Sequence, residues 1–340
     1  MNQVQDNPAA EQFARLDAMI GETPLLAISM RYRGEPRTVY AKAEAFNLSG
    51  SIKDRVAYYI LKKAYAAGKI KPGDIIAEAT SGNTGIAFSA VGAALGHPVV
   101  IYMPDWMSVE RINLMRSYGA EVRLVSAEQG GFQGSIRLTE ELAKQGNVFL
   151  PCQFSNEDNA EAHEVLTGPE IVRQLAALGK TADAVVAGVG TGGTVMGIGR
   201  ALRHVNPDCA MFPLEPLNSP TLSTGYKTGK HRIQGISDEF IPPICHMDEA
   251  TGVVSVDDID SIRMAQMLAR KLGIGVGISS GANLLGCLIA GDRIGADKTI
   301  VTVFADDNKK YLSTDYCEDF PADEGCMTSS IELLGVHAVK

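Results

Sequence analysis

The sequence alternates short apolar runs with longer amphipathic stretches, and this alternation limits the possible fold more than any other feature. Strands are predicted from apolar and β-branched runs at 38–43, 74–78, 98–103, 121–126, 184–189, 211–215 and 299–304. Several of these runs are continuously apolar, which is typical of parallel strands covered on both faces. Helices are predicted between them at 54–68, 84–95, 108–118, 133–145, 160–178, 194–204, 257–272 and 282–293. The pattern predicts an α/β fold with parallel sheets and right-handed crossovers.

Two segments depart from the alternation. Residues 216–246 contain four prolines and several glycines, and so long an irregular stretch in a compact domain is usually functional or mobile. From about residue 317 the periodicity is lost, so we expect 317–340 to form a C-terminal tail or an interface segment. Between these two segments, Asp257 is placed to start a helix and Gly273 to end it.

Composition excludes several classes of function. A net charge of −9 and a pI of about 5.2 argue against a nucleic-acid partner. We expect no membrane association and a cytoplasmic location, since no apolar run reaches membrane-spanning length and the first residues are polar. The six cysteines have neither CxxC nor metal-ligand spacing, which predicts reduced thiols and no metal site. The 340 residues suffice for two lobes with separate cores.

The segment GVGTGGT joins a predicted strand to a predicted helix. Glycines let backbone N–H groups approach an anion, and the start of the following helix adds a favourable dipole. The segment matches neither the Walker A motif nor a complete dinucleotide fingerprint. This segment alone is therefore consistent with both a phosphate cup and a purely structural turn.

Lys53 lies in the segment NLSGSIKDR, in the first turn of a predicted helix, where the helix dipole disfavours a cation. It is an ordinary surface lysine, an anion-binding group, or a neutral amine that forms an imine. Two further loops precede helices: TSGNT at 80–84, suited to a carboxylate, and the segment around Ser279, whose hydroxyl suits a ring nitrogen. Helix capping by these Ser and Thr residues is the alternative for both loops.

Together these segments supply the groups needed to hold pyridoxal phosphate and an amino acid. The motifs SIKDR, EATSGNTGIA, HEVLTGPEI, GVGTGGTVMGIGRAL and GISSGAN resemble, in this order, the cysteine synthase (O-acetylserine sulfhydrylase) family. That family belongs to the β-family, or fold type II, of pyridoxal-phosphate enzymes, with cystathionine β-synthase and serine dehydratase. The resemblance runs from about Gly21 to about Thr314.

The resemblance implies a two-lobed α/β fold with parallel-rich sheets flanked by helices. A smaller mobile lobe would comprise 46–152, a larger cofactor lobe 1–45 with 153–316, and 317–340 would be a tail. It also implies pyridoxal 5′-phosphate as cofactor, an amino-acid substrate and a homodimer. No metal is implied.

The resemblance also assigns roles to residues at matching motif positions. Lys53 would bind the cofactor covalently, Asn83 its ring oxygen and Ser279 its pyridine nitrogen. The phosphate would be held by Gly190, Thr191, Gly192, Gly193 and Thr194. The substrate carboxylate would be held by Thr80, Ser81, Thr84 and Gln153.

The sequence departs from the family in two places. After IQGI the family usually has small residues, whereas here Asp238 and Glu239 occur. Asp238 is either a catalytic base toward water or a thiol, which would also repel a sulfide anion, or a surface acid. Some cysteine synthase-like lyases, which release sulfide from cysteine and leave serine, use an aspartate in this loop, and the chain is similar to them in that respect. Near the end, Asp306 and Asp307 either touch the pocket around the ring nitrogen or cap a turn.

The resemblance implies β-replacement on a three-carbon amino acid through an aminoacrylate, as when O-acetylserine and sulfide give cysteine. The alternative is a cysteine lyase or desulfhydrase that uses Asp238 to release sulfide, with serine or pyruvate as product. A further alternative is a serine or threonine dehydratase. A non-catalytic regulatory or scaffold relative that retains the fold would lack Lys53 or the phosphate cup, and both are intact. A dinucleotide-binding oxidoreductase would need Glu215 as its ribose ligand.

Overall fold

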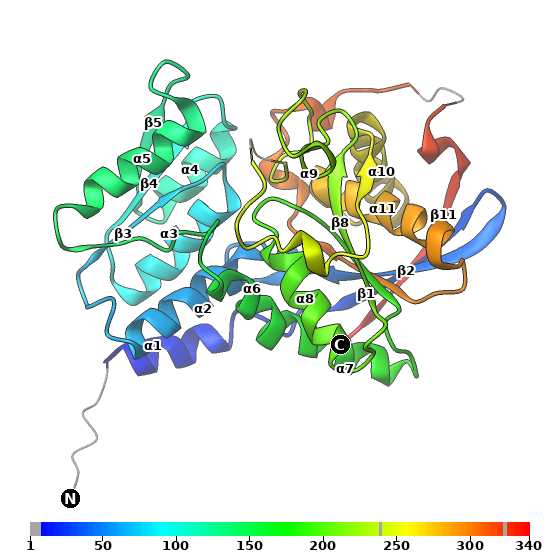
Figure 1. The fold of residues 1–340 in the computed structure, drawn as a ribbon, viewed down its shortest axis with the longest axis horizontal. Helices are drawn as coiled ribbons and strands as arrows, with labels where there is room; N and C mark the ends of the chain where they lie inside the picture. The colour runs from blue at the N-terminus through cyan, green and yellow to red at the C-terminus, as the bar shows by residue number, and fades with distance from the viewer. Residues whose placement is uncertain (1–7, 238–239, 322–324) are drawn as a thin grey trace, which may run out of the picture. The chain divides into compact units, whose positions relative to one another are not determined.

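A computed structural model describes residues 8–237, 240–321 and 325–340 (Figure 1). The chain divides into two compact units. The smaller unit contains the described part of Met1–Gly21 and all of Asn47–Cys152. The larger contains Glu22–Phe46 and the described part of Gln153–Lys340. Helix α1 (Pro8–Asp17), which the sequence did not predict, thus groups with the smaller unit, whereas the segment 1–45 was expected in the larger lobe.

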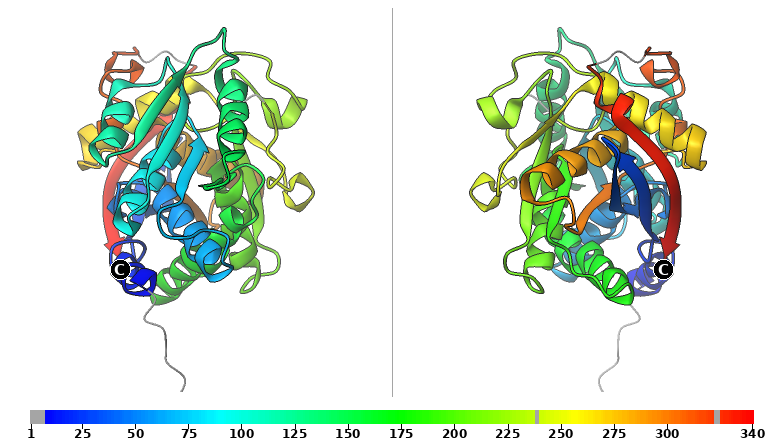
Figure 2. Two further views of the ribbon diagram at one scale, coloured as in Figure 1. Left: turned by 90° about the vertical axis from the view of Figure 1, so that its left-hand side faces the viewer. Right: turned by 90° about the vertical axis from the view of Figure 1, so that its right-hand side faces the viewer.

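The smaller unit is built on a parallel sheet with the strand order β5-β4-β3-β6. Its strands are β3 (Ile75–Ala79), β4 (Val99–Pro104), β5 (Glu121–Val125) and β6 (Val148–Phe149). Its further helices are α2 (Lys53–Ala66), α3 (Asn83–Leu95), α4 (Val109–Ser117) and α5 (Gly131–Ala143). The strand order advances from β3 to β5 and then returns to β6, so right-handed crossovers put α3 and α4 on one face and α5 on the other. The left view in Figure 2 shows this arrangement.

The larger unit has a mixed sheet with the order β11-β1-β2-β10-β7-β8-β9. The strands β2, β10, β7, β8 and β9 run parallel, whereas β1 is antiparallel to both β2 and β11. The bounds are β1 (Leu25–Tyr32), β2 (Glu35–Ala43), β7 (Ala184–Gly188), β8 (Ala210–Pro216), β9 (Val254–Val256), β10 (Ile300–Phe304) and β11 (Ile331–Val339). The predicted α/β class with parallel-rich sheets is confirmed.

Strand β11 corrects the expectation of a tail at 317–340. It pairs with β1 from Leu25 to Tyr32, so the end of the chain is an edge strand of the sheet (Figure 2, right). The pattern was missed because β11 is exposed over most of its length and shows little apolar alternation. Strands β1, β6 and β9 were also not predicted; the last two span only Val148–Phe149 and Val254–Val256.

Helices cover both faces of the larger sheet. These helices are α6 (Asp158–Ala162), α7 (Gly168–Ala177), α8 (Gly193–Arg203), α9 (Thr221–Thr224), α10 (Asp258–Leu272) and α11 (Ile278–Ile294). Right-handed crossovers place α7 and α8 on one face and α10 and α11 on the other (Figure 1). Asp257 caps α10 by accepting from the N–H groups of Ile259 and Asp260, and Gly273 ends the helix in the left-handed conformation, as predicted.

The single helix predicted at 160–178 is interrupted. A π-helical turn, His163–Thr167, separates α6 from α7. Such turns insert a residue into the helical ladder and often occur at functional sites. The apolar pattern reveals that a helix is present here but not that its hydrogen bonding changes.

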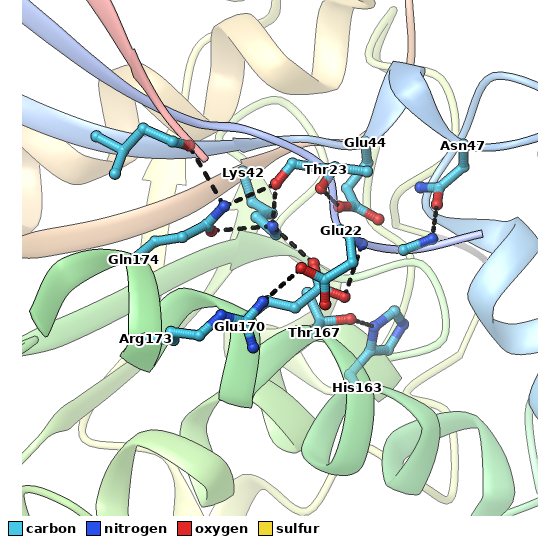
Figure 3. Close-up of polar contacts among 12 residues, drawn as sticks. Glu22, Thr23, Lys42, Glu44, Asn47, His163, Thr167, Glu170, Arg173 and Gln174 are labelled. Carbon is cyan, nitrogen blue, oxygen red and sulfur yellow. Dashed lines mark hydrogen bonds and ion pairs between the residues drawn. The ribbon is translucent and has the colours of Figure 1, made fainter. Parts of the chain in front are cut away.

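A buried ion pair joins α7 to the sheet (Figure 3). The fully buried Lys42 on β2 places its Nζ 2.7 Å from Glu170 Oε2 and 3.0 Å from Gln174 Oε1, and it also donates to the carbonyl of Thr23. Gln174 Nε2 in turn donates to the carbonyls of Thr23, at 2.9 Å, and Val339, at 3.3 Å. The cluster thus fixes β2, α7 and the last residue of β11 relative to one another.

Glu170→Ala is expected to lower the free energy of unfolding of the larger unit by about 3–5 kcal/mol, because it leaves the Lys42 ammonium buried without its carboxylate. Urea denaturation followed by circular dichroism measures the change. Arg173→Ala on the same helix is the matched control. Its ion pair with Glu22 is largely exposed, so the expected loss is below about 1 kcal/mol. Equal losses in the two variants would contradict this account.

Candidate active site

The turn before Lys53 is fixed by the carboxylate of Asp54. This buried group accepts from the backbone N–H of Ser49 at 2.8 Å and of Ser51 at 3.4 Å, and also from the Ser49 hydroxyl. An anion in the first turn also interacts favourably with the helix dipole. Lys53 is the first residue of α2, as the sequence predicted, and its side chain is half-buried. The local sequence therefore places a lysine at a firmly held helix start.

The TSGNT loop leads from β3 into α3. Thr80 donates its backbone N–H to the carbonyl of Tyr102 at 3.1 Å, and its hydroxyl accepts from the N–H of Gly82 at the same distance. Asn83 is the first residue of α3, and Thr84 is buried in the same turn. The N-cap is Gly82, so no Ser or Thr occupies the N-cap position that the capping alternative requires.

Lys53 and Asn83 lie at the same end of a packed helix pair. Helices α2 and α3 contact each other, and near their C-terminal ends the Tyr65 hydroxyl lies 2.6 Å from Nε2 of His97. Lys53 and Asn83 are the first residues of these two helices. The smaller unit therefore packs the helix that Lys53 begins against the helix that follows the 80–84 loop.

The segment Gly190–Thr194 connects β7 to α8, and its glycines cannot be replaced without conflict. A Cβ atom on Gly190 would lie 2.4 Å from the carbonyl oxygen of Gly235. On Gly193 it would lie 2.3 Å from Oδ1 of Asn159. Gly192, the N-cap of α8, has φ +87°, and a Cβ would lie 2.5 Å from that of Cys245. Close packing by Gly235, Asn159 and Cys245 therefore requires glycine at all three positions.

Ser279 lies in the first turn of α11, and Asn283, one turn later, holds this helix end in place. Oδ1 of Asn283 accepts from the N–H of Gly188 at 2.9 Å, and its Nδ2 donates to the carbonyl of Val303 at 2.8 Å. These partners lie on β7 and β10, so the buried Ser279 is positioned near the carboxyl edge from which the 190–194 loop leaves. The N-cap of α11 is Gly277, so Ser279 is not its N-cap residue.

The loop around Asp238 is anchored just before that residue. Ser237, with φ +56°, donates its N–H to the carbonyl of Val189 at 2.7 Å. This contact holds Ser237 beside the residue that follows β7 and precedes the 190–194 loop. Asp238 and Glu239 themselves lie outside the described residues.

The two acids near the end of β10 differ in their surroundings. Asp306 is fully buried and accepts from the Tyr311 hydroxyl at 2.6 Å. Asp307 caps a short 3₁₀ turn by accepting from the N–H of Lys309. The turn-capping alternative is thus confirmed for Asp307.

Glu215 does not support a dinucleotide site. Its carboxylate accepts from the backbone N–H of Leu222 at 2.7 Å and of Ser223 at 3.2 Å, and from the hydroxyls of Ser223 and Ser255. An acid committed to four such bonds is not available to a ribose, so this alternative loses its key residue.

All six cysteines, each within the described residues, are free thiols, as predicted. Burial raises the pKa of Cys245 to about 11, which keeps this thiol protonated and weakly nucleophilic at neutral pH. Among the described residues no group of His, Cys, Asp and Glu is arranged to hold a metal ion. None of the described helices combines the length and apolar character needed to cross a membrane.

Comparison with known families now identifies the chain. Residues 16–306 match the family described as "Pyridoxal-phosphate dependent enzyme". The chain belongs to this family. The inferred cofactor, pyridoxal phosphate, and the cysteine synthase resemblance are both confirmed. The glycine-lined start of α8 fits a phosphate group, and a lysine at the start of α2 fits an imine-forming amine.

Relatives in the cysteine synthase branch cover most of the chain. A probable cysteine synthase of Bacillus subtilis is 43% identical over 87% of this chain and 95% of its own length. A cysteine synthase of Staphylococcus aureus is 41% identical over 87% of this chain and 94% of its own length. Among solved structures, a hydrogen sulfide-producing enzyme from Fusobacterium nucleatum is 55% identical with a TM-score of 0.94, covering 97% of this chain and 100% of that one.

Sequence reasoning missed two buried polar residues that organise the site, Asn159 and Asn283. The side chain of Asn283 hydrogen-bonds to backbone groups distant in sequence, and that of Asn159 hydrogen-bonds to the distant Thr191 hydroxyl. A polar residue on an otherwise apolar helix face is the signal that could have singled out Asn283. It would not have indicated the partners, because those are set by tertiary packing.

Gly190→Ala is expected to lower the affinity for pyridoxal phosphate by about tenfold or more, because the added methyl group meets the Gly235 carbonyl and must displace the loop. Equilibrium dialysis of the cofactor measures the effect. Gly335→Ala is the control, since nothing lies within 4 Å of its Cβ position on β11. Unchanged affinity in Gly190→Ala would show that the loop does not bind the cofactor.

Proposed function

We propose that this enzyme catalyses β-replacement on a three-carbon amino acid in the manner of cysteine synthase, converting O-acetylserine and sulfide to cysteine. The observation that carries the proposal is Lys53 at the start of α2, directly after a turn that the carboxylate of Asp54 holds. The B. subtilis and S. aureus relatives are named cysteine synthases, which supports the same reaction. We also propose a homodimer in the cytoplasm.

The proposed roles follow from where each group lies. Bound pyridoxal phosphate supplies an electron sink that weakens the bonds at the substrate α- and β-carbons. In the proposal, Lys53 binds the cofactor and later takes the α-proton, Asn83 donates to the ring oxygen, and Ser279 meets the ring nitrogen. The loop Gly190–Thr194 holds the phosphate. The substrate carboxylate is held by Thr80, Ser81, Thr84 and Gln153.

A second candidate is a lyase that releases sulfide from cysteine, with Asp238 as the catalytic acid–base group. Two observations favour it. Ser237, directly before Asp238, is bonded to Val189 at the phosphate cup. In addition, a variant of the 55% identical F. nucleatum enzyme, with an aspartate changed to asparagine, is described in complex with an α-aminoacrylate intermediate. Dehydration of serine or threonine is the further alternative.

Lys53→Ala is expected to abolish the visible absorbance of the lysine-bound cofactor and to lower turnover by at least about a hundredfold. Absorbance spectra and cysteine formation from O-acetylserine and sulfide measure the two effects. Lys62→Ala, on the exposed side of the same helix, is the matched control and should change neither. A wild-type protein that stays colourless with added pyridoxal phosphate would refute the proposed function.

Asp238→Asn decides between replacement and sulfide release. If the lyase reading is correct, the variant loses at least about a hundredfold of its sulfide release from cysteine and keeps the cofactor absorbance. Glu239→Gln removes the neighbouring charge and should leave turnover unchanged. Sulfide and serine are measured with cysteine as the sole substrate, and pyruvate is measured with serine. Equal sulfide release by wild type and Asp238→Asn would return Asp238 to a surface role.

A further inference from the structure

Two buried side chains outside the predicted site contact the hydroxyl groups of the phosphate cup. Asn159 on α6 donates its Nδ2 to Thr191 Oγ1 at 3.0 Å. His163, in the π-helical turn, has its Nε2 3.3 Å from Thr194 Oγ1. Both are fully buried, and they are spaced four residues apart. We propose that Asn159 and His163 are positioning residues that make Thr191 and Thr194 donate their hydroxyl protons to the cofactor phosphate. The inference rests on the proposed phosphate-binding role of residues 190–194.

The orientation of the Asn159 amide is determined by its partners. Its Nδ2 also donates to the backbone carbonyl of Gln153 at 2.8 Å. A flipped amide would put two oxygens against each other, so the donor must face both Gln153 and Thr191. Thr191 Oγ1 additionally accepts from the N–H of Gly193 at 3.3 Å. With two donors directed at this oxygen, the hydroxyl proton remains as the group to offer to a ligand.

The His163 ring has partners on both nitrogens (Figure 3 shows the Thr167 contact). Its Nδ1 lies 2.9 Å from Thr167 Oγ1. If the Thr167 hydroxyl donates to Nδ1, the proton of the neutral ring resides on Nε2 and is donated to Thr194. Thr194 then keeps its own proton for the phosphate. In the opposite tautomer the Thr194 hydroxyl would donate its proton to His163 Nε2, and Thr194 would be a poorer anion ligand.

Close helix packing keeps these contacts in register. A Cβ on Gly197 of α8 would lie 2.0 Å from the Ala160 carbonyl and 2.7 Å from His163 Cβ. A Cβ on Gly168, the first residue of α7, would lie 2.2 Å from Cβ of Ala201. The segment 158–168 therefore lies directly against α8, with little freedom to slide. Glu170 on α7 joins the same segment to β2 through the buried Lys42.

The experiment compares the affinities of the whole protein for pyridoxal phosphate and for pyridoxal, which lacks the phosphate. Asn159→Ala and His163→Leu are each expected to weaken pyridoxal phosphate binding by about tenfold and to leave pyridoxal binding within about twofold. His163→Gln, which retains a donor near the Nε2 position, is expected to recover most of the loss. Thermal unfolding of the cofactor-free proteins shows separately whether each variant is folded.

A double-mutant cycle tests the pairing itself. In a Thr194→Val background, His163→Leu should cause little further loss, because the hydroxyl it positions is gone. Thr191→Val and Asn159→Ala form the second cycle. Additive losses, or equal weakening for both ligands, would overturn the inference and leave these side chains a purely structural role. If His163→Leu fails to fold, His163→Gln compared with His163→Asn decides, since only the former should support phosphate affinity.

The outcomes also separate this inference from the proposed function. If the wild-type protein binds neither ligand, the cofactor assignment fails. If the wild type binds pyridoxal phosphate more tightly than pyridoxal and the variants keep the same ratio, only the positioning roles of Asn159 and His163 fail.

Discussion

The ion pair between Lys42 and Glu170 is the interaction on which the larger unit most depends. An ammonium group with no exposed surface is tolerated in a protein interior only when its charge is matched and its donors are used. Here Glu170 on α7 supplies the matching negative charge, and Gln174 and Thr23 supply the additional acceptors. The requirement therefore links a strand in the middle of the sheet to one helix, and that helix continues from the π turn that carries His163.

Small residues extend this close packing to the 190–194 loop. Gly197 and Gly168 allow the segment 158–168 and α8 to approach closely, and Gly193 lies against Asn159. Contacts this close leave few alternative packings, because protein interiors do not deform continuously. The start of α8 is thus fixed from outside the loop as well as by the glycines within it. In the smaller unit Asp54 has the corresponding role, since its carboxylate holds the turn that presents Lys53.

Much of the fold could be predicted because it depends on local patterns. Apolar periodicity located the strands from β2 to β10 that run longer than three residues. It also located α2, α3, α4, α5, α8, α10 and α11 to within a few residues and the region of α6 and α7, but not α1. Asp257 caps the start of α10 and Gly273 ends it, and both roles could be predicted from the residue types. Strand β11 was missed because an exposed edge strand has little periodicity to detect. Its place was decided by a partner, β1, about 300 residues away in the chain.

The sequence by itself determined the chemistry that the chain can carry. Lysine at a helix start and a glycine-lined strand–helix turn are local features, and their order along the chain resembles that of one family of enzymes. Only the tertiary structure decided how these groups are held. Asn159, His163 and Asn283 act on residues far from them in sequence, and a buried polar side chain has no preferred partner until packing supplies one. Local sequence can place a functional group on an element, whereas its orientation depends on hydrogen bonds that exist only once distant segments meet.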